Sequence, residues 1–310
     1  MLTSLKNIIA QTLPPMTLFW VRSAKRALMG EPPISPPDAE TKPQMAARRS
    51  KTSWLPGPRT MQTEALERLD EHQISAPYLF FGIDDILILP AKEIARALTL
   101  GVFYINSADV KGDVAEFGTM GGFTARTLAA AMIFDPQYQP NHPLRKLCLF
   151  DSFEGLPEFT SKIDIDSPHV KSGTWSKGGC KVLGHRELRA MVEGIIPPDR
   201  VEINKGWFAD TVKALPDDTR FALIHFDGDL YQSTMDALVP CFERGFISKG
   251  AVLCFDDWNC NQGDPEYGER RAWTDLVERF NIVASHGGDY SIQSTKFIVH
   301  SYRGMRTTSV

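Results

Sequence analysis

The sequence predicts an α/β protein of the Rossmann-like, doubly wound class, with a mostly parallel seven-stranded sheet, an antiparallel closing strand and an N-terminal helical cap. Three stretches carry most of this prediction. The apolar runs at residues 221–226 and 250–255 stop abruptly at acidic residues, as buried parallel strands do where they enter a loop. Residues 113–117 form a third such run, which continues through a glycine-rich turn into a helical stretch at 123–133.

Length and composition exclude several classes of protein. The 310 residues allow one large domain or two modest ones. The net charge of −4 gives no sign of a nucleic-acid partner. The five cysteines have no zinc-binding spacing, and their odd number without a disulfide framework suggests a reducing compartment. We therefore expect a cytoplasmic protein that does not bind nucleic acid.

Residues 1–59 differ in character from the rest of the chain. Residues 1–29 combine basic and aromatic side chains without any acidic one, and residues 31–58 are rich in proline, which predicts an extended arm. The basic part suits either a solvated helix docked on the body or peripheral contact with an anionic membrane, and we favour the helix. No apolar run reaches the roughly 18 residues of a spanning helix, and no signal peptide is recognisable.

The pattern of residues 60–108 predicts helices that precede every strand. A helical pattern begins near residue 60, and Pro90 suits the first turn of a further helix with an apolar stripe. The stripe consists of Ile94, Ala97, Leu98, Gly101 and Val102. We expect these helices to form a cap over the site, and we assign residues 109–310 to the ligand-binding domain.

Four more strands complete the expected sheet, at residues 146–150, 200–204, 282–285 and 291–300. The last two predict an antiparallel pair joined across Gly287 and Gly288. A helix is expected near 269–280. Residues 158–180 are polar and long for a loop, which predicts a lid, with His169 as a candidate for substrate contact.

Acidic residues follow two of the strands and form the first candidate site. Asp227 and Asp229 end one apolar run, and Asp256 and Asp257 end another. If these strands are neighbours, the four carboxylates meet at the carboxyl edge of the sheet, where open α/β sheets bind ligands. Crowded carboxylates repel unless a proton or cation lies among them. Two ordinary helix-capping loops are the alternative, but the repetition favours a functional site. We interpret His225 as a buried, hydrogen-bonded core residue.

The glycine-rich turn at 118–122 forms a second candidate site, because a strand–turn–helix layout lets backbone amides hold a ligand. Asp151 ends the next strand, where an acidic residue is well placed to accept hydrogen bonds from ribose hydroxyls. The glycine spacing is not GxGxxG, which argues against a dehydrogenase.

Together these motifs resemble the class I S-adenosylmethionine-dependent methyltransferases and, more narrowly, the macrocin O-methyltransferase family, which methylates sugar hydroxyls. The resemblance covers roughly residues 85–300. It rests on DVAEFG (113–118), FDSFEGLP (150–157), KGWFADT (205–211), FDGDLYQST (226–234) and FDD (255–257). Thr119 and Met120 depart from the family pattern, in which a bulkier, basic segment is common.

The resemblance implies a site for S-adenosylmethionine. Glu116 and Gly118 would line its methionine end, Asp151 would hold the ribose, and Trp207 and Phe208 would border the adenine. The implied cofactor-binding residues are Glu116, Gly118, Thr119, Gly121, Asp151, Ser152, Phe153, Trp207, Phe208 and Asp227. Structural roles stay open for Glu116, as the partner of a basic side chain, and for Trp207 and Phe208, as core residues.

The resemblance also implies a divalent cation, bound by Asp227, Asp256 and Asp257, with Asp229 as the general base. Oxygen-only ligands suit Mg²⁺ or another hard cation. A cation lowers the pKa of a sugar hydroxyl, and a carboxylate can then take its proton during methyl transfer. We therefore expect a metal-assisted O-methyltransferase acting on a hydroxyl of a sugar, glycan or glycosylated small molecule.

Two alternatives remain at this point. Asp227-Gly-Asp229 could be the DxD motif of a metal-dependent glycosyltransferase, although that leaves the glycine turn and Asp151 unexplained. The second alternative is a non-catalytic partner protein that has a methyltransferase fold. The sequence leaves the acceptor and the oligomeric state open, a homo-oligomer included.

Overall fold

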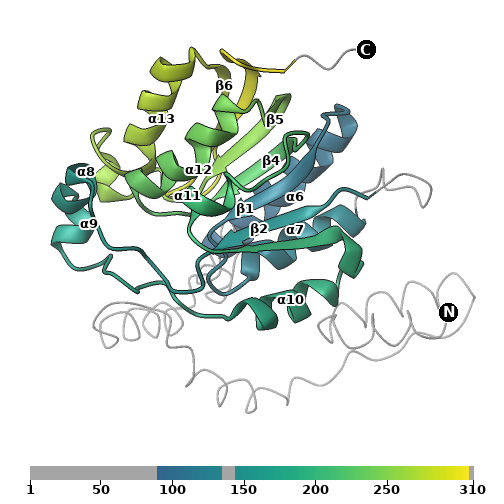
Figure 1. Cartoon of the computed structure of the whole chain (residues 1–310), viewed down its shortest axis with the longest axis horizontal. Coiled ribbons are helices and arrows are strands. Elements are labelled where there is room, and N and C mark those ends of the chain that lie inside the picture. Colours follow the sequence, from purple (N-terminus) through teal and green to yellow (C-terminus); the bar gives the residue numbers. More distant parts are fainter. Residues whose placement is uncertain (1–88, 135–143, 307–310) are drawn as a thin grey trace, which may run out of the picture. The chain divides into compact units, whose positions relative to one another are not determined.

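The computed structural model describes residues 89–134 and 144–306 (Figure 1). The predictions for residues 1–59, and for 60–88 of the cap, lie outside the described residues. Within the described part, no helix is both long enough and apolar enough to cross a membrane.

A single seven-stranded sheet forms the centre of the fold, in the order β3-β2-β1-β4-β5-β7-β6. Strands β1 to β5 are parallel, and β7 runs antiparallel to both of its neighbours, β5 and β6. The strands are β1 Asp113–Phe117, β2 Leu147–Asp151, β3 Val201–Lys205, β4 Phe221–Phe226, β5 Ile247–Phe255, β6 Val283–Asp289 and β7 Thr295–Ser301. The predicted seven strands, and the neighbouring positions of β4 and β5, are confirmed.

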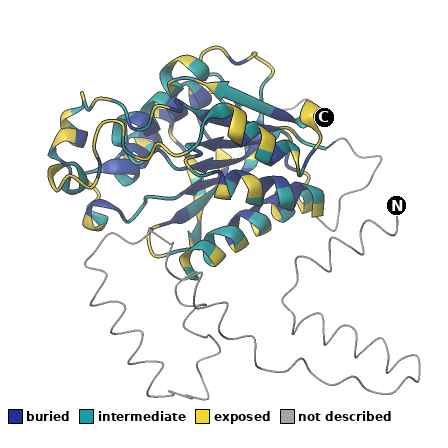
Figure 2. Ribbon diagram, turned by 90° about the horizontal axis from the view of Figure 1, so that it is seen from below, coloured by how far each residue is buried: buried dark blue, intermediate teal, exposed yellow. Residues whose placement is uncertain are grey.

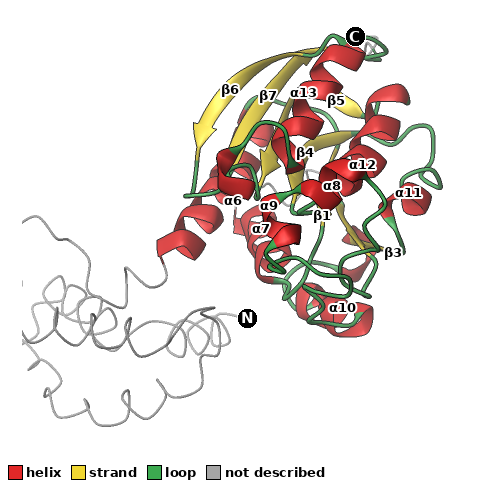
Figure 3. Cartoon of the chain, turned by 90° about the vertical axis from the view of Figure 1, so that its left-hand side faces the viewer, coloured by secondary structure: helices red, strands yellow, loops and turns green. Residues whose placement is uncertain are grey.

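Helices cover both faces of the sheet (Figures 1 and 3). One face carries α6 (Leu89–Ser107), α7 (Phe123–Phe134) and α10 (His185–Glu193). The other carries α11 (Phe208–Thr211), α12 (Tyr231–Glu243) and α13 (Gly268–Phe280). The remaining helices are α8 (Lys162–Asp166) and α9 (Pro168–Lys171), with 3-10 turns at Pro198–Arg200 and Asn261–Gly263.

Alternation along the strands explains why their sequences are apolar throughout. In β2, Leu147 and Leu149 pack on the face that carries α7, whereas Cys148 and Phe150 pack on the face that carries α11. Successive side chains of a strand point to opposite faces, so a strand covered on both sides needs an apolar residue at every position. Figure 2 shows the buried residues along the strands and on the inner faces of the helices.

Helix α6 corrects the prediction of a cap. Its predicted stripe is largely buried, but it packs on α7 and on the sheet rather than over the site. Gly101 lies so close to the sheet that a Cβ there would be 2.8 Å from Leu223 Cδ1. A continuous apolar stripe suits a helix layered on a sheet, and the α/β domain therefore includes residues 89–108.

The closing strands differ from the prediction in their connection. Gly287 and Gly288 lie inside β6, and the chain turns between β6 and β7 instead. The pairing register shifts between His286 and Asp289, and Gly288 has a φ of +90°. These glycines permit an irregularity in the ladder, a role that sequence cannot distinguish from a tight turn.

Candidate active site

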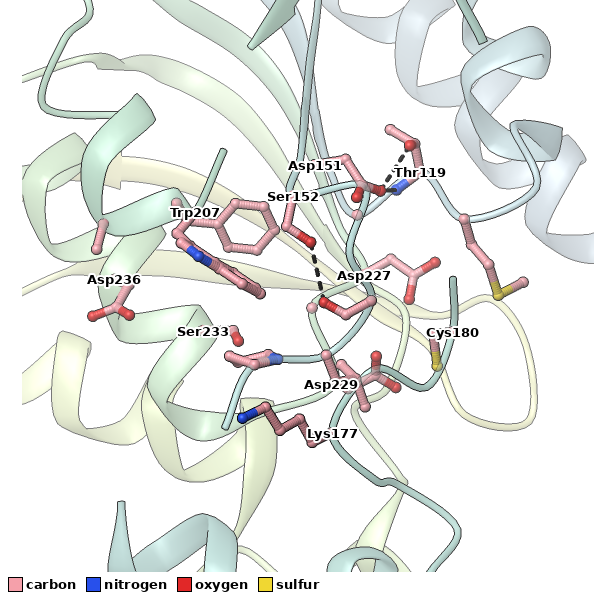
Figure 4. Close-up of a pocket in the computed structure, with 18 of the residues that line it drawn as sticks. Thr119, Asp151, Ser152, Lys177, Cys180, Trp207, Asp227, Asp229, Ser233 and Asp236 are labelled. Carbon is pink, nitrogen blue, oxygen red and sulfur yellow. Dashed lines mark hydrogen bonds between the residues drawn. The ribbon is translucent and has the colours of Figure 1, made fainter. Parts of the chain in front are cut away.

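A cavity of about 670 Å³ opens at the carboxyl ends of the parallel strands. Its lining comes from the loops after β1, β2, β3, β4 and β5 (Figure 4). It therefore lies where the strand order reverses between β1 and β4, the usual ligand-binding position in doubly wound sheets.

The glycine turn is pressed against the first acidic loop. Gly118 has a φ of +87°, and a Cβ at this position would lie 1.8 Å from the carbonyl oxygen of Asp227. The amide of Asp227 donates to the carbonyl of Phe117 at 2.8 Å. Only glycine allows this approach, so Gly118 fixes the position of Asp227 at the cavity wall.

Asp151 ties the end of β2 to the glycine turn. Its Oδ2 accepts hydrogen bonds from the amide and the hydroxyl of Thr119, both at 2.8 Å (Figure 4). Its Oδ1 accepts one from the amide of Phe153 at 2.6 Å. The carboxylate is thereby held at the cavity wall. A carboxylate has about four acceptor sites, which leaves capacity for a ligand hydroxyl.

Three carboxylates converge at the ends of β4 and β5. Oxygen atoms of Asp227, Asp229 and Asp257 lie within 4.8 Å of one another. Burial and the charge of Asp227 raise the pKa of Asp229 to about 8. Burial also raises the pKa values of Asp227 and Asp257, and their acidic neighbours reinforce the effect. The group can accommodate either a proton or a cation.

Asp256, the third predicted metal ligand, is not one of these three converging carboxylates, although it lines the same cavity as Asp227 and Asp229. Its Oδ1 accepts a hydrogen bond from Ser294 Oγ at 3.1 Å and lies 3.7 Å from His225 Nε2. Its backbone still continues the ladder, because its amide donates to the carbonyl of Phe226. Side chains of consecutive residues diverge at a strand end, so Asp256 and Asp257 face different neighbours.

His225 and Glu116 form a buried pair behind the site. Both side chains are fully buried, and His225 Nδ1 donates to Glu116 Oε1 at 3.0 Å. Burial alone would lower the pKa of His225, but Asp256 and Glu116 together raise it to about 10. The interpretation of His225 as a hydrogen-bonded core residue is confirmed, and Glu116 takes the structural role that was its alternative.

The predicted cofactor residues divide into two groups. Those that line the cavity are Gly118, Thr119, Asp151, Ser152, Trp207, Phe208 and Asp227. Three others do not line it: Glu116, Gly121 and Phe153. The Phe153 side chain packs in the core beside α7 and α10, because a φ of +57° turns it away from the cavity. Trp207 is 39% exposed, whereas Phe208 packs edge-on against Phe117 and is partly core.

The segment at 155–180, which contains the predicted lid at 158–180, lines part of the cavity. Its two ends pair through hydrogen bonds between Leu156 and the glycines at 178 and 179. Lys177 and Cys180 line the cavity, and Lys177 pairs with Glu158 at 3.0 Å. Helices α8 and α9 lie within this segment, so it is more ordered than a bare loop.

His169 has a structural role in this segment. Its Nδ1 accepts from the amide of Asn261 at 2.9 Å, and its own amide donates to Asn261 Oδ1 at 3.0 Å. It does not line the cavity, so the structure does not support the predicted substrate contact. Nearby, Asp164 accepts from the amides of Tyr231 and Gln232, which caps the start of α12.

Sequence reasoning missed several lining residues. Ser233 and Asp236 continue the cavity wall along α12. Their spacing of three residues places them on one helical face and was readable from the sequence. Asp210, Met120 and Cys180 also line the cavity, but the sequence carries no comparable signal for them.

The strand order, the glycine turn after β1, the acidic residue after β2 and the acidic ends of β4 and β5 together define the class I methyltransferase fold. Within that class, the chain belongs to the macrocin O-methyltransferase (TylF) family, whose model matches residues 94–284.

Curated relatives agree with this assignment. The chain is 30% identical over 179 residues to the 8-demethyl-8-(2,3-dimethoxy-alpha-L-rhamnosyl)-tetracenomycin-C 4'-O-methyltransferase of Streptomyces olivaceus, a match covering 56% of this chain and 64% of the relative. It is 29% identical to the mycinamicin III 3''-O-methyltransferase of Micromonospora griseorubida, covering 54% and 65% of the two chains. The matches thus span somewhat less than two thirds of these relatives.

Solved structures support the fold. The O-methyltransferase NovP superposes with a TM-score of 0.52 at 21% identity, over 67% of this chain and 80% of NovP. The calicheamicin methyltransferase CalS11 also gives 0.52, at 23% identity, over 79% and 94% of the two chains.

Proposed function

We propose that the protein is an S-adenosylmethionine-dependent O-methyltransferase that methylates a hydroxyl of a sugar or of a glycosylated small molecule. The main observation is that one cavity is lined both by Asp151 with the glycine turn and by Asp227 and Asp229, two of the three converging carboxylates. Family membership supports the reaction class. The tetracenomycin relative named above supports a glycosylated acceptor, because its printed name includes a rhamnosyl group.

The cavity suits the cofactor in size and in chemistry. Its volume of about 670 Å³ is within the usual range for small-molecule sites. Asp151 is held in place to accept from ribose hydroxyls, and the half-exposed Trp207 offers an aromatic face to the adenine. S-adenosylmethionine carries a net positive charge, which suits a wall rich in carboxylates.

A hard divalent cation such as Mg²⁺ fits the acidic group. Asp227 and Asp257 belong both to the predicted ligand set and to the converging group. Asp257 Oδ2 is buried and has no hydrogen-bond donor among the described residues. This is expected of an oxygen that serves as a cation ligand. A bound cation would supply Lewis acidity that lowers the pKa of the acceptor hydroxyl.

Asp229 is the proposed base. It follows Gly228, and any Cβ at position 228 would lie 2.6 Å from the ring of Phe226, so this turn holds Asp229 tightly at the cavity. In the metal-free protein, burial and the charge of Asp227 raise the pKa of Asp229 to about 8, which favours a carboxyl group that accepts a proton. Asp229 takes the hydroxyl proton, the acceptor oxygen bonds to the methyl carbon, and the methyl–sulfur bond breaks to release S-adenosylhomocysteine.

Calorimetry separates this function from the glycosyltransferase alternative. We expect S-adenosylhomocysteine to bind the protein, and UDP and GDP not to bind. Binding of a nucleoside diphosphate without S-adenosylhomocysteine would contradict the proposal. The similarities support neither the glycosyltransferase nor the non-catalytic alternative, since the matching family and relatives are methyltransferases.

A further inference from the structure

Glu269, the second residue of α13, is a fully buried carboxyl group that the proposed reaction does not use. Its Oε2 accepts a hydrogen bond from the amide of Asp257 at 3.0 Å. Its Oε1 is shut off from solvent and has no hydrogen-bond partner among the described residues. A buried carboxyl oxygen without a donor is costly, so its presence beside the acidic group requires an explanation.

The start of α13 is pressed against both acidic loops. Gly268 has a φ of +57°, and a Cβ there would lie 3.0 Å from Asn261 Nδ2 and 3.6 Å from the carbonyl oxygen of Asp229. Helix α13 therefore begins next to the backbone of Asp229, and Glu269 contacts the backbone of Asp257. The Glu269 carboxyl group therefore lies against the backbone of Asp257, one member of the converging group.

The basic side chains around Glu269 are engaged elsewhere. Arg270 donates to the carbonyl of Gly263, and Arg271 pairs with Asp275 and Glu266. His225 lies between Glu116 and Asp256. Among the described residues, no ion pair involves Glu269, although the charges of Asp257, Asp256 and Asp227 all act on it.

We propose that Glu269 is a positioning residue of the cation site. It fixes the backbone of Asp257 through the amide hydrogen bond, so that the Asp257 carboxylate faces the cation, and it adds a negative charge behind that ligand. The cation compensates the buried acidic charges together, which explains why Glu269 lacks a basic partner. This inference rests on the cation site of the proposed function.

Glu269→Gln tests the role of the charge, because glutamine keeps the size and can still accept from the Asp257 amide. The full-length protein is stripped with EDTA, and Mn²⁺ binding is then measured by calorimetry. We expect the variant to bind Mn²⁺ roughly 10–100-fold more weakly than the unaltered protein, as with other residues that orient metal ligands. Glu278→Gln, an exposed residue of the same helix, is the control and should leave Mn²⁺ affinity unchanged.

The melting temperature in EDTA distinguishes this role from a purely structural one. We expect Glu269→Gln to melt no lower than the unaltered protein, because glutamine keeps the hydrogen bond to the Asp257 amide and is never charged. Unchanged Mn²⁺ affinity together with a lower melting temperature would overturn the inference. If the glutamine variant fails to fold, Glu269→Asp keeps the charge but shortens the reach; its Mn²⁺ affinity should also fall, and unchanged affinity would overturn the positioning role. If the unaltered protein binds no Mn²⁺, the cation site itself is refuted along with the inference.

Discussion

At the residue scale, the site is a set of carboxyl groups in different settings. Asp151 accepts three hydrogen bonds and stays anchored to the glycine turn. Asp227, Asp229 and Asp257 share one small space, where burial opposes their ionisation. Asp256 instead accepts a hydrogen bond from the hydroxyl of Ser294. The same residue type can therefore hold a ribose, bind a cation or accept a proton, depending on its partners.

Asp151→Ala should weaken binding of S-adenosylhomocysteine. The ribose would lose a charged acceptor worth roughly 1.5–3 kcal/mol, which corresponds to about a 10–150-fold loss of affinity. Calorimetry measures the change, and circular dichroism checks that the glycine turn still folds without its bonds to Asp151. Wild-type affinity in a folded variant would show that Asp151 serves only to hold Thr119.

Asp229 should make the metal-free protein less stable as the pH rises. Its pKa is about 8 in the folded protein against an ordinary value of 3.8, so folding favours the protonated form. The associated stability is fully present below about pH 4 and is lost as the pH rises through about 8. Melting temperatures in EDTA across this range should fall less for Asp229→Asn than for the unaltered protein. Parallel curves for the two proteins would exclude Asp229 as the titrating group.

At the element scale, the strand-to-helix loops depend on glycines that no other residue can replace. Gly118→Ala should cost about 3 kcal/mol of stability or more, because the new Cβ would overlap the Asp227 carbonyl at a strained φ of +87°. Gly121→Ala is the matched control in the same turn, since nothing lies within 4 Å of its Cβ position. Chemical denaturation measures both. Equal stabilities of the two variants would contradict the close contact between Gly118 and the Asp227 carbonyl.

The strands were the most predictable elements. Strands β1 and β4 begin and end at the predicted residues, because strands buried on both faces are apolar throughout and end where charge begins. The placement of α6 was not predictable, since an apolar stripe fits a cap as well as a sheet face. The different directions of Asp256 and Asp257 depend on strand register, and the burial of Phe153 depends on a positive φ; neither follows from sequence alone.

At the scale of the whole molecule, every described residue that lines the cavity follows the start of β1. Its lining runs from Gly118 to Asp256. Removing residues 1–59 should therefore leave a folded protein that binds S-adenosylhomocysteine with unchanged affinity. Calorimetry on the protein starting at residue 60 tests this expectation. Loss of binding in a folded truncated protein would mean that the N-terminal segment contributes to the site.

In the proposed reaction, the cofactor, the cation and the acidic group act together. The most direct test of this reaction is mass spectrometry of the native acceptor pool after incubation with methyl-labelled S-adenosylmethionine. We expect a labelled methyl group on a hydroxyl of a sugar-containing product, lost after EDTA stripping and restored by Mg²⁺. Asp229→Asn should reduce the rate by about 10²–10⁴-fold while Mn²⁺ still binds. Full transfer by the stripped protein would contradict the role of the cation, and no labelled product from protein that binds S-adenosylhomocysteine would contradict the proposed activity.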